Sequence, residues 1–207
     1  MGTLAEQMHA ARKEVMTRPI VFLDTETTSL RLDRDAWEIG IIRRDSTGAE
    51  ARIQMFIDVD VTQADPRALD VGGYWARHPR GKWMADPTHL SATDQDTFDQ
   101  MWSRRDAARA VAKLTHAATI VGAVPDFDTQ TLTRLLFSNG MVPTWHHRLR
   151  CVETLTAGHM GWDVGGLGEC AAALGIEVPV GAAHTALGDA ETAMRIWDLV
   201  LGDGPTS

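Results

Sequence analysis

The amino-acid sequence predicts an α/β fold in which one mixed β-sheet is flanked by helices. Three strand-like segments follow one another near the beginning of the chain, and helical and strand-like segments then alternate up to about residue 201. This order is typical of a sheet that combines antiparallel and parallel strands and packs against helices. The length of 207 residues suffices for one well-packed core and is marginal for two domains.

The strand-like segments at the beginning of the chain differ in their hydrophobic pattern. Residues 20–23 form a continuous apolar run, which indicates a strand buried on both faces. Residues 36–43 are also rich in apolar side chains, and the turn-forming residues 45–48 follow them. Residues 52–59 alternate between polar and apolar, so we expect a hairpin or meander of three strands.

The second half of the sequence predicts alternating helices and short strands. Apolar residues recur at helical spacing in 104–116 and 127–139, and Gly140 is a plausible end for the second of these helices. The remaining expected elements are strands at 118–123 and 148–152 and helices at 153–159, 167–174 and 185–201.

Two segments fall outside this pattern. Residues 4–16 fit a short amphipathic helix, so residues 1–17 are predicted to be an N-terminal helical extension of a main domain spanning 18–202. Residues 64–102 are rich in proline, glycine and tryptophan, and we expect a loop-rich insertion with short helices. Aromatic and basic residues interleave in 74–83, which could form a stacking platform for single strands. The favoured interpretation is that its tryptophans anchor the insertion to the core.

The composition indicates the expected cellular compartment and limits the kinds of partner. No run of 18 apolar residues occurs, so no membrane span is expected. The only cysteines are Cys151 and Cys170, far apart, which favours a reducing compartment, and the expected location is cytoplasmic. A net charge of −8 disfavours extensive binding along duplex nucleic acid. It does not exclude a nucleic-acid substrate, because carboxylates that hold metal ions present phosphate with a neutralised surface.

Asp24 and Glu26 lie at the end of the first predicted strand. Their spacing of two residues directs both side chains to the same face of an extended chain. Neighbouring carboxylates repel each other unless a cation lies between them, and Mg²⁺ and Mn²⁺ prefer such oxygen ligands. The alternative is an acidic pair on a surface loop without any metal.

Three further residues have both a structural and a catalytic interpretation. Asp128 and Asp189 each fall in the first turn of a predicted helix, where an acid is stabilised by the helix dipole, and Asp126 is a candidate N-cap for the first of these helices. His184 precedes the final helix, and a single histidine is more often structural than catalytic.

Taken together, these motifs resemble the DEDDh group of the DnaQ-like 3′→5′ exonucleases. The resemblance spans about residues 19–201 and depends on order, spacing and local context. Its motifs are Val21-Phe22-Leu23-Asp24-Thr25-Glu26-Thr27-Thr28, then Val121-Gly122-Ala123 through Phe127-Asp128, then His184-Thr185-Ala186-Leu187-Gly188-Asp189-Ala190. The chain departs from the family pattern at Ser29, where glycine is common, and at Val124-Pro125-Asp126, where asparagine usually precedes Phe-Asp.

The resemblance implies a ribonuclease H-like fold, with a mixed five-stranded sheet and helices on both faces. It implies that two divalent cations, Mg²⁺ or Mn²⁺, are held by the four acids, and that His184 is the general base. It also implies that the backbone of Thr27 meets the terminal 3′ hydroxyl, that Leu30 wedges against the terminal bases, and that Phe127 packs beside the site. The four metal-binding residues implied in this way are Asp24, Glu26, Asp128 and Asp189.

The expected activity is hydrolysis at a nucleic-acid 3′ end that releases nucleoside 5′-monophosphates. A single-stranded end is the expected substrate, with DNA favoured over RNA. One alternative is an RNA exonuclease similar to ribonuclease T or oligoribonuclease, since only contacts with the 2′ hydroxyl separate these substrates. Another is a catalytically quiet DnaQ-like module that binds a polymerase. A DNA polymerase or another replication or repair protein is a possible partner, and the sequence leaves the oligomeric state open.

Overall fold

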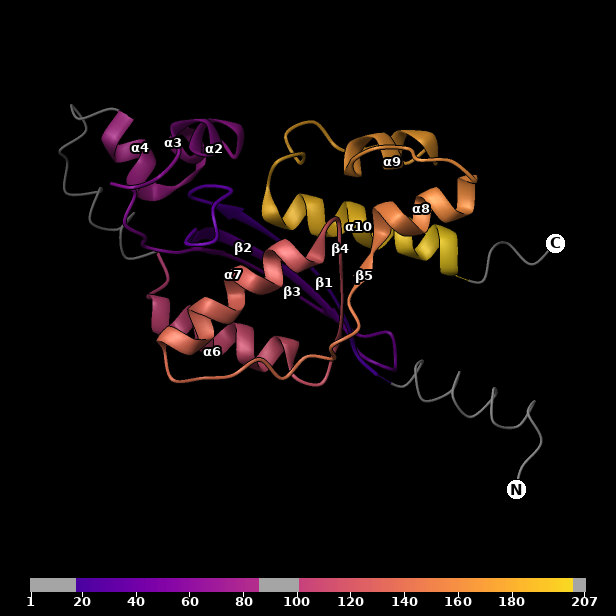
Figure 1. Cartoon of the computed structure of the whole chain (residues 1–207), viewed down its shortest axis with the longest axis horizontal. Helices are drawn as coiled ribbons and strands as arrows, with labels where there is room; N and C mark the ends of the chain where they lie inside the picture. The colour runs from indigo at the N-terminus through magenta and orange to yellow at the C-terminus, as the bar shows by residue number, and fades with distance from the viewer. Residues whose placement is uncertain (1–17, 86–100, 203–207) are drawn as a thin grey trace, which may run out of the picture.

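The computed structural model describes residues 18–85 and 101–202 of the chain. They form a mixed five-stranded sheet in the order β3-β2-β1-β4-β5, with helices on both faces (Figure 1). β1 pairs antiparallel with β2 and parallel with β4, β2 pairs antiparallel with β3, and β4 pairs parallel with β5. The strands are β1 (Ile20–Thr27), β2 (Ala36–Arg44), β3 (Glu50–Phe56), β4 (Thr119–Gly122) and β5 (Arg150–Cys151).

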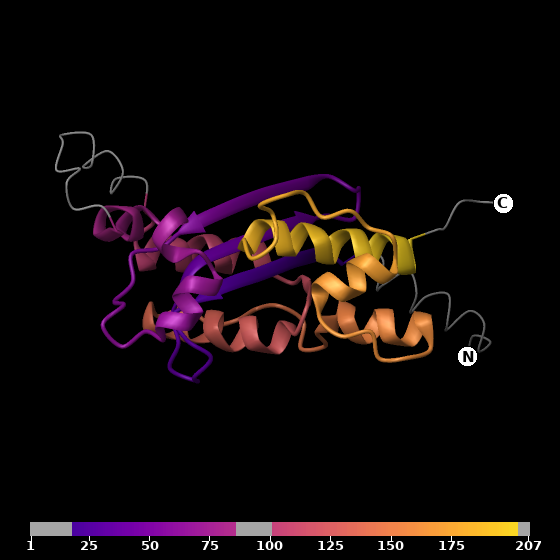
Figure 2. The ribbon, with the colours of Figure 1, turned by 90° about the horizontal axis from the view of Figure 1, so that it is seen from above.

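The sheet divides the hydrophobic core into two layers, each of which is covered by helices. α6 and α7 pack on one face of the sheet with Val21 and Leu23, whereas α8, α9 and α10 pack on the other face with Phe22 (Figures 1 and 2). Because successive side chains of a strand point to opposite faces, the continuous apolar run of β1 supplies both layers. The helices are α2 (Pro66–Val71), α3 (Tyr74–Arg77), α4 (Pro79–Ala85), α6 (Arg104–Thr115), α7 (Pro125–Ser138), α8 (Val152–Met160), α9 (Leu167–Ala173) and α10 (Ala186–Leu201).

The structure confirms the predicted order of elements and corrects some of their boundaries. β1 continues to Thr27, so the apolar run 20–23 is followed by four further strand residues that include Asp24 and Glu26. α7 begins at Pro125, whose fixed φ suits the first helical position, and Val124 is the N-cap; the prediction that Asp126 caps this helix is therefore wrong. Gly140 has a φ of 72° just after α7, as expected for a residue that ends a helix.

The described part of the insertion forms the short helices α2, α3 and α4. Tyr74 is fully buried, and its ring lies 5.3 Å from that of Trp37, edge to face. Trp75 packs against the same core and donates a hydrogen bond of 3.0 Å from Nε1 to Asp70. These contacts support the core-anchoring interpretation for Tyr74 and Trp75, whereas Trp83, the other tryptophan of 74–83, is 40% exposed. The predicted N-terminal helical extension, and the part of the insertion at 86–100, lie outside the described residues.

One property of the helices bears on the membrane prediction. Within residues 18–85 and 101–202, no helix combines the length and the apolar character needed to span a membrane.

Candidate active site

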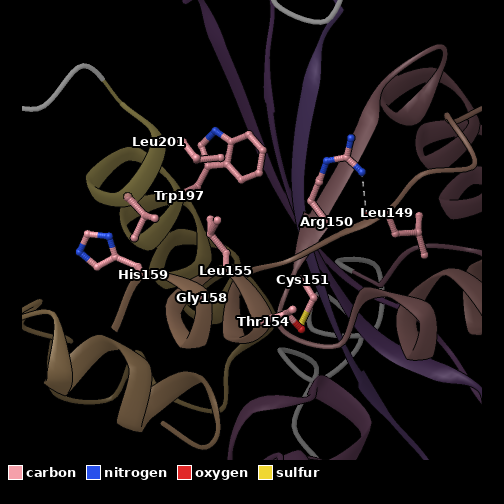
Figure 3. Close-up of a pocket in the computed structure, with 10 residues that line it drawn as sticks. Leu149, Arg150, Cys151, Thr154, Leu155, Gly158, His159, Trp197 and Leu201 are labelled. Carbon is pink, nitrogen blue, oxygen red and sulfur yellow. Dashed lines mark hydrogen bonds between the residues drawn. The ribbon is translucent and has the colours of Figure 1, made fainter. Parts of the chain in front are cut away.

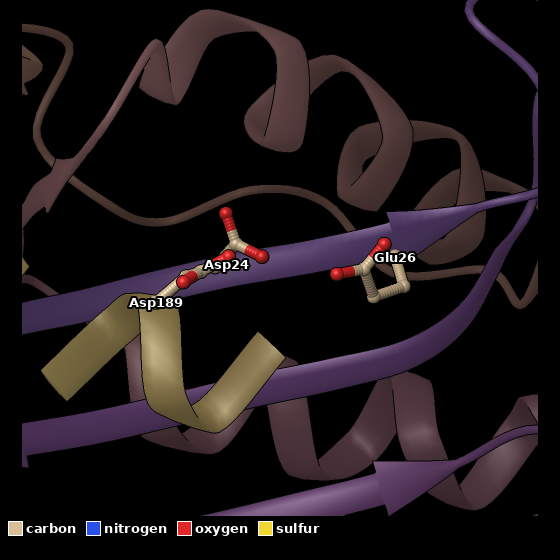
Figure 4. A group of neighbouring side chains, drawn as sticks. All are labelled: Asp24, Glu26 and Asp189. Carbon is tan, nitrogen blue, oxygen red and sulfur yellow. The ribbon is translucent and has the colours of Figure 1, made fainter. Parts of the chain in front are cut away.

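Three carboxylates from two distant parts of the chain converge beside the sheet. Asp24 and Glu26 leave β1 on the side that faces the first turn of α10, where Asp189 lies (Figure 4). One oxygen from each of the three carboxylates lies within 4.8 Å of the others. Such a set of oxygen ligands fits a hard divalent cation.

Gly40 explains how Asp189 reaches the strand. It pairs directly with Asp24 across the antiparallel ladder of β1 and β2. A Cβ atom at Gly40 would lie only 2.3 Å from the backbone of Ala186, so any other residue would push the start of α10 away from the sheet. The hydroxyl of Thr185 caps this helix by accepting a hydrogen bond of 3.1 Å from the amide of Gly188.

Asp128 approaches the same place from the opposite face of the sheet. It lies in the first turn of α7 and is 95% buried, with a relative exposure of 5%. Its Oδ1 accepts a hydrogen bond of 2.7 Å from the hydroxyl of Thr25. β4 ends at Gly122 while β1 continues, and a groove of about 340 Å³ opens there. Its lining residues are Asp24, Thr25, Glu26, Leu30, Ala123, Val124, Phe127, Asp128 and Asp189.

Burial and mutual repulsion disfavour the charged forms of the carboxylates in the groove. Burial, followed by repulsion from Asp128 and Asp189, raises the pKa of Asp24 well above its ordinary value. Burial and the nearby Glu38 raise the pKa of Glu26 to about 8. Burial also raises the pKa of Asp189. A divalent cation would remove this repulsion, so the residues present fit a metal centre.

His184 lies next to the acids but does not line the groove that they share. It sits in the turn before α10 with a φ of 57°, and its amide donates a hydrogen bond of 3.2 Å to Asp189. Its exposed side chain lines a neighbouring hollow of about 750 Å³ between α9 and α10, and Asp189 forms a wall of both spaces. The structure therefore brings His184 to the edge of the acidic cluster through its backbone.

The three predicted substrate-binding residues occupy different positions. Leu30 is 78% exposed at the rim of the groove. Phe127 lines the groove, and the guanidinium of Arg34 lies 3.6 Å from the centre of its ring. Thr27 is buried outside the groove lining, and its hydroxyl donates a hydrogen bond of 2.9 Å to the carbonyl of Ser29.

The structure adds a fifth acid that the sequence motifs do not include. Glu38 on β2 is the cross-strand partner of Glu26, and it is fully buried. Its Oε2 lies 2.5 Å from Nη1 of Arg77, which belongs to α3 in the insertion. A glutamate inside the apolar segment of β2 was a visible signal in the sequence, because buried carboxylates are rare without a partner. Nothing local in the sequence identifies that partner.

A separate apolar hollow of about 710 Å³ contains none of the predicted site residues (Figure 3). β5, α8 and the end of α10 form it, with Trp197 and Leu155 among the lining side chains. Its lining supplies no acidic side chain, so it does not compete with the groove as a metal site.

No protein-family model and no curated protein sequence matches this chain. Solved structures do match it. Escherichia coli exonuclease I in complex with a dT13 oligonucleotide aligns with a TM-score of 0.61 at 17% identity, over 88% of this chain and 41% of that one. Apo exonuclease I aligns with a TM-score of 0.63 at 16% identity, over 89% of this chain and 42% of that one.

The chain has the ribonuclease H-like fold of exonuclease I. A product-bound exonuclease I structure gives a similar match, with a TM-score of 0.62 at 16% identity, over 89% of this chain and 43% of that one. The chain spans about two fifths of the length of these proteins. The predicted fold class, a mixed five-stranded sheet flanked by helices, is thereby confirmed.

Proposed function

We propose that this chain is a metal-dependent 3′→5′ exonuclease that hydrolyses the terminal phosphodiester bond of a single-stranded nucleic acid, with DNA favoured. The convergence of Asp24, Glu26 and Asp189 on one point beside the sheet carries this proposal. The oligonucleotide complex of exonuclease I, which has the same fold, supports a nucleic-acid substrate.

Each residue in or beside the groove would have a distinct role in this reaction. Asp24, Glu26, Asp128 and Asp189 would hold two divalent cations, Mg²⁺ or Mn²⁺. When bound, such cations activate water, neutralise charge on the transferring phosphoryl group and stabilise the leaving oxygen. Leu30 and Phe127 would present apolar surfaces to the terminal nucleotide from the rim and the wall of the groove. The backbone of Thr27 would meet the 3′ hydroxyl.

His184 would act as the general base that takes a proton from the attacking water. Histidine is the side chain that most often transfers protons in enzyme active sites, so it suits this role. The ring lines the hollow next to the groove, so it must turn toward Asp189 when substrate binds. Rotation about the side-chain bonds of an exposed residue makes this movement rapid.

The test is digestion of single-stranded DNA and RNA labelled at the 5′ end, with Mg²⁺ or Mn²⁺ or with a chelator. We expect metal-dependent shortening from the 3′ end, with DNA degraded faster, and at least about a 100-fold loss of rate in Asp24→Asn and His184→Ala. A substrate blocked at its 3′ end should resist. Absence of shortening of either substrate would refute the proposal.

The outcome on the two substrates also decides between the alternatives. Faster digestion of RNA would identify an enzyme similar to ribonuclease T or oligoribonuclease. Cleavage of the 3′-blocked substrate would indicate an endonuclease. An inactive protein that binds a DNA polymerase would instead be the catalytically quiet module.

A further inference from the structure

Arg77 connects the insertion to two parts of the candidate site. Its Nη1 lies 2.5 Å from Oε2 of Glu38, and its Nη2 donates a hydrogen bond of 2.8 Å to the carbonyl of His184. Nε and Nη2 also donate to the carbonyl of Gly72, with a distance of 3.0 Å from Nε. A planar guanidinium can make the ion pair and these hydrogen bonds at once because its five donors are fixed in a fork.

The contact with Glu38 stabilises a charge close to the metal-binding acids. Glu38 is fully buried and lies directly across the strand pair from Glu26. Its other oxygen accepts a hydrogen bond of 2.5 Å from the side chain of Gln54. Without Arg77, a buried carboxylate would lie beside the acidic cluster with no cation to balance it, and that is costly.

The contact with His184 fixes an unfavourable backbone conformation. His184 and Ala117 are the non-glycine residues with positive φ within 18–85 and 101–202. This conformation is unfavourable for a residue with a side chain. The amide of His184 is held by Asp189 and its carbonyl by Arg77, so both ends of the residue are tied to charged groups.

The turn between α2 and α3 also touches a metal-binding residue directly. A Cβ atom on Gly72 would lie 2.6 Å from Oε2 of Glu26 and 2.8 Å from the ring of Trp37. The carbonyl of the same glycine is the one that Arg77 binds. The insertion therefore packs against Glu26 on one side and holds the turn of His184 on the other.

We propose that Arg77 is a positioning residue for the exonuclease reaction. Its contacts with Glu38 and Gly72 anchor the guanidinium, which in turn keeps the backbone of His184 at a fixed position relative to the acids. This inference rests on the proposed function of the same site. It gives the insertion a role in catalysis that involves no contact between Arg77 and the reacting atoms.

A purely structural role for Arg77 makes a different prediction. If Arg77 only balanced the charge of Glu38, removing both charges together would restore the enzyme. The key variant is therefore the double substitution Arg77→Met/Glu38→Gln, which keeps the packing volume and leaves no unpaired buried charge. Arg77→Met alone measures the combined effect of leaving the charge of Glu38 unbalanced and of losing the hydrogen bond to His184. Arg80→Ala is the matched control, because Arg80 belongs to the same insertion and its Nη2 lies 2.7 Å from the carboxylate of Asp58, away from the groove.

Single-turnover and steady-state digestion of 5′-labelled single-stranded DNA measures the kinetic effect. We expect Arg77→Met/Glu38→Gln to unfold at nearly the wild-type temperature, with kcat lowered about 100-fold and KM changed less than about 3-fold, since a small misplacement of a reacting group has this effect. Arg80→Ala should keep the wild-type kcat. Recovery of the wild-type kcat in the double variant would overturn the proposal.

Amide hydrogen exchange at His184 tests the same inference by a measurement that does not depend on nuclease activity. We expect exchange of this amide to be about 10-fold faster in the double variant than in wild type, because loosening the turn weakens its bond to Asp189. Exchange should be unchanged in Arg80→Ala. If wild type degraded no nucleic acid, the proposed function would fail, and unchanged exchange at His184 in the double variant would separately refute the positioning role.

Discussion

The hydroxyl of Thr25 donates a hydrogen bond of 2.7 Å to Oδ1 of Asp128 and so joins β1 to α7 within the candidate site. Thr25 points to the face of the sheet opposite to Asp24 and Glu26, because neighbouring residues of a strand alternate. Burial raises the pKa of Asp128, and the hydrogen bond from Thr25 counteracts that rise. This bond both orients the carboxylate and favours its charged form, which is the form that the proposed metal binding requires.

Replacing Thr25 by valine removes this hydrogen bond while keeping the shape of the side chain. We expect Thr25→Val to weaken Mn²⁺ binding and to lower nuclease activity about 10- to 100-fold, as is typical when a partner of a metal ligand is lost. Isothermal titration with Mn²⁺ measures the affinity. Thr25→Ser keeps the hydroxyl and should stay within a few-fold of wild type. Equal losses in the two variants would show that the hydroxyl is not the important feature.

Neutralising Asp24 should stabilise the protein in the absence of metal. The pKa of this carboxyl is raised by burial and by neighbouring acids, so its charge opposes folding near neutral pH. In the presence of chelator we expect Asp24→Asn to melt several degrees above wild type, at roughly 2–4 °C per kcal/mol for a chain of this size. Added Mg²⁺ should raise the melting temperature of wild type and not of the variant.

Asp33→Asn is the control for this comparison. Asp33 is exposed and forms a surface ion pair with Arg31, 3.0 Å apart. Its replacement should leave the melting temperature nearly unchanged, since exposed ion pairs contribute little. A metal-free Asp24→Asn protein that melts below wild type would contradict the electrostatic account of the site.

Gly72 should tolerate no side chain even though its φ of −71° suits any residue. A Cβ atom there meets Oε2 of Glu26 at 2.6 Å and Trp37 at 2.8 Å. We expect Gly72→Ala to lower the free energy of unfolding by about 1–3 kcal/mol, the usual cost of overpacking, and to weaken Mn²⁺ binding by displacing Glu26. Denaturant unfolding and metal titration measure the two effects.

Gly158→Ala is the control for Gly72→Ala, and we expect it to stabilise the protein rather than destabilise it. Gly158 lies in α8, and a Cβ atom there has no neighbour within 4 Å. Alanine is the better helix former, so the free energy of unfolding should rise by about 0.5–1 kcal/mol. If Gly72→Ala also raised the free energy of unfolding, as expected for Gly158→Ala, that result would contradict a close contact between the insertion and Glu26.

His78 should make the stability of the protein fall in acid. The ring is fully buried against Tyr74, with ring centres 4.5 Å apart, and burial lowers its pKa to about 4. The unfolded chain takes up this proton near pH 6.5, so between pH 6.5 and 4 it binds more protons than the folded chain. The contribution of His78 is complete above pH 6.5 and is lost as the pH falls toward 4.

The full loss amounts to roughly 3 kcal/mol in the free energy of unfolding. Urea unfolding of wild type and His78→Gln across pH 4–8 isolates it, because the acids with raised pKa contribute equally to both proteins and cancel in the difference. The difference in the free energy of unfolding between wild type and His78→Gln should become smaller as the pH falls from 6.5 to 4. A constant difference would show that His78 is not held neutral by burial.

Local patterns in the sequence were sufficient to predict the sheet. The apolar run before Asp24, the alternation in β3 and the helical spacing of α10 reflect burial of one or both faces of an element, which each segment encodes by itself. Element ends were harder to predict. β1 extends to Thr27 because it pairs with β2 along its whole length, and that pairing lies in another part of the chain.

The sequence by itself determined which acids are available and that two of them share one face of a strand. Only the tertiary structure decided what surrounds them. Gly40 lets α10 approach until Asp189 reaches Asp24, and Arg77 crosses from the insertion to pair with the buried Glu38. The structure also placed the ring of His184 beside the groove rather than in it. These relationships depend on close packing between distant segments, and neither hydrophobic periodicity nor motif spacing records which segments will touch.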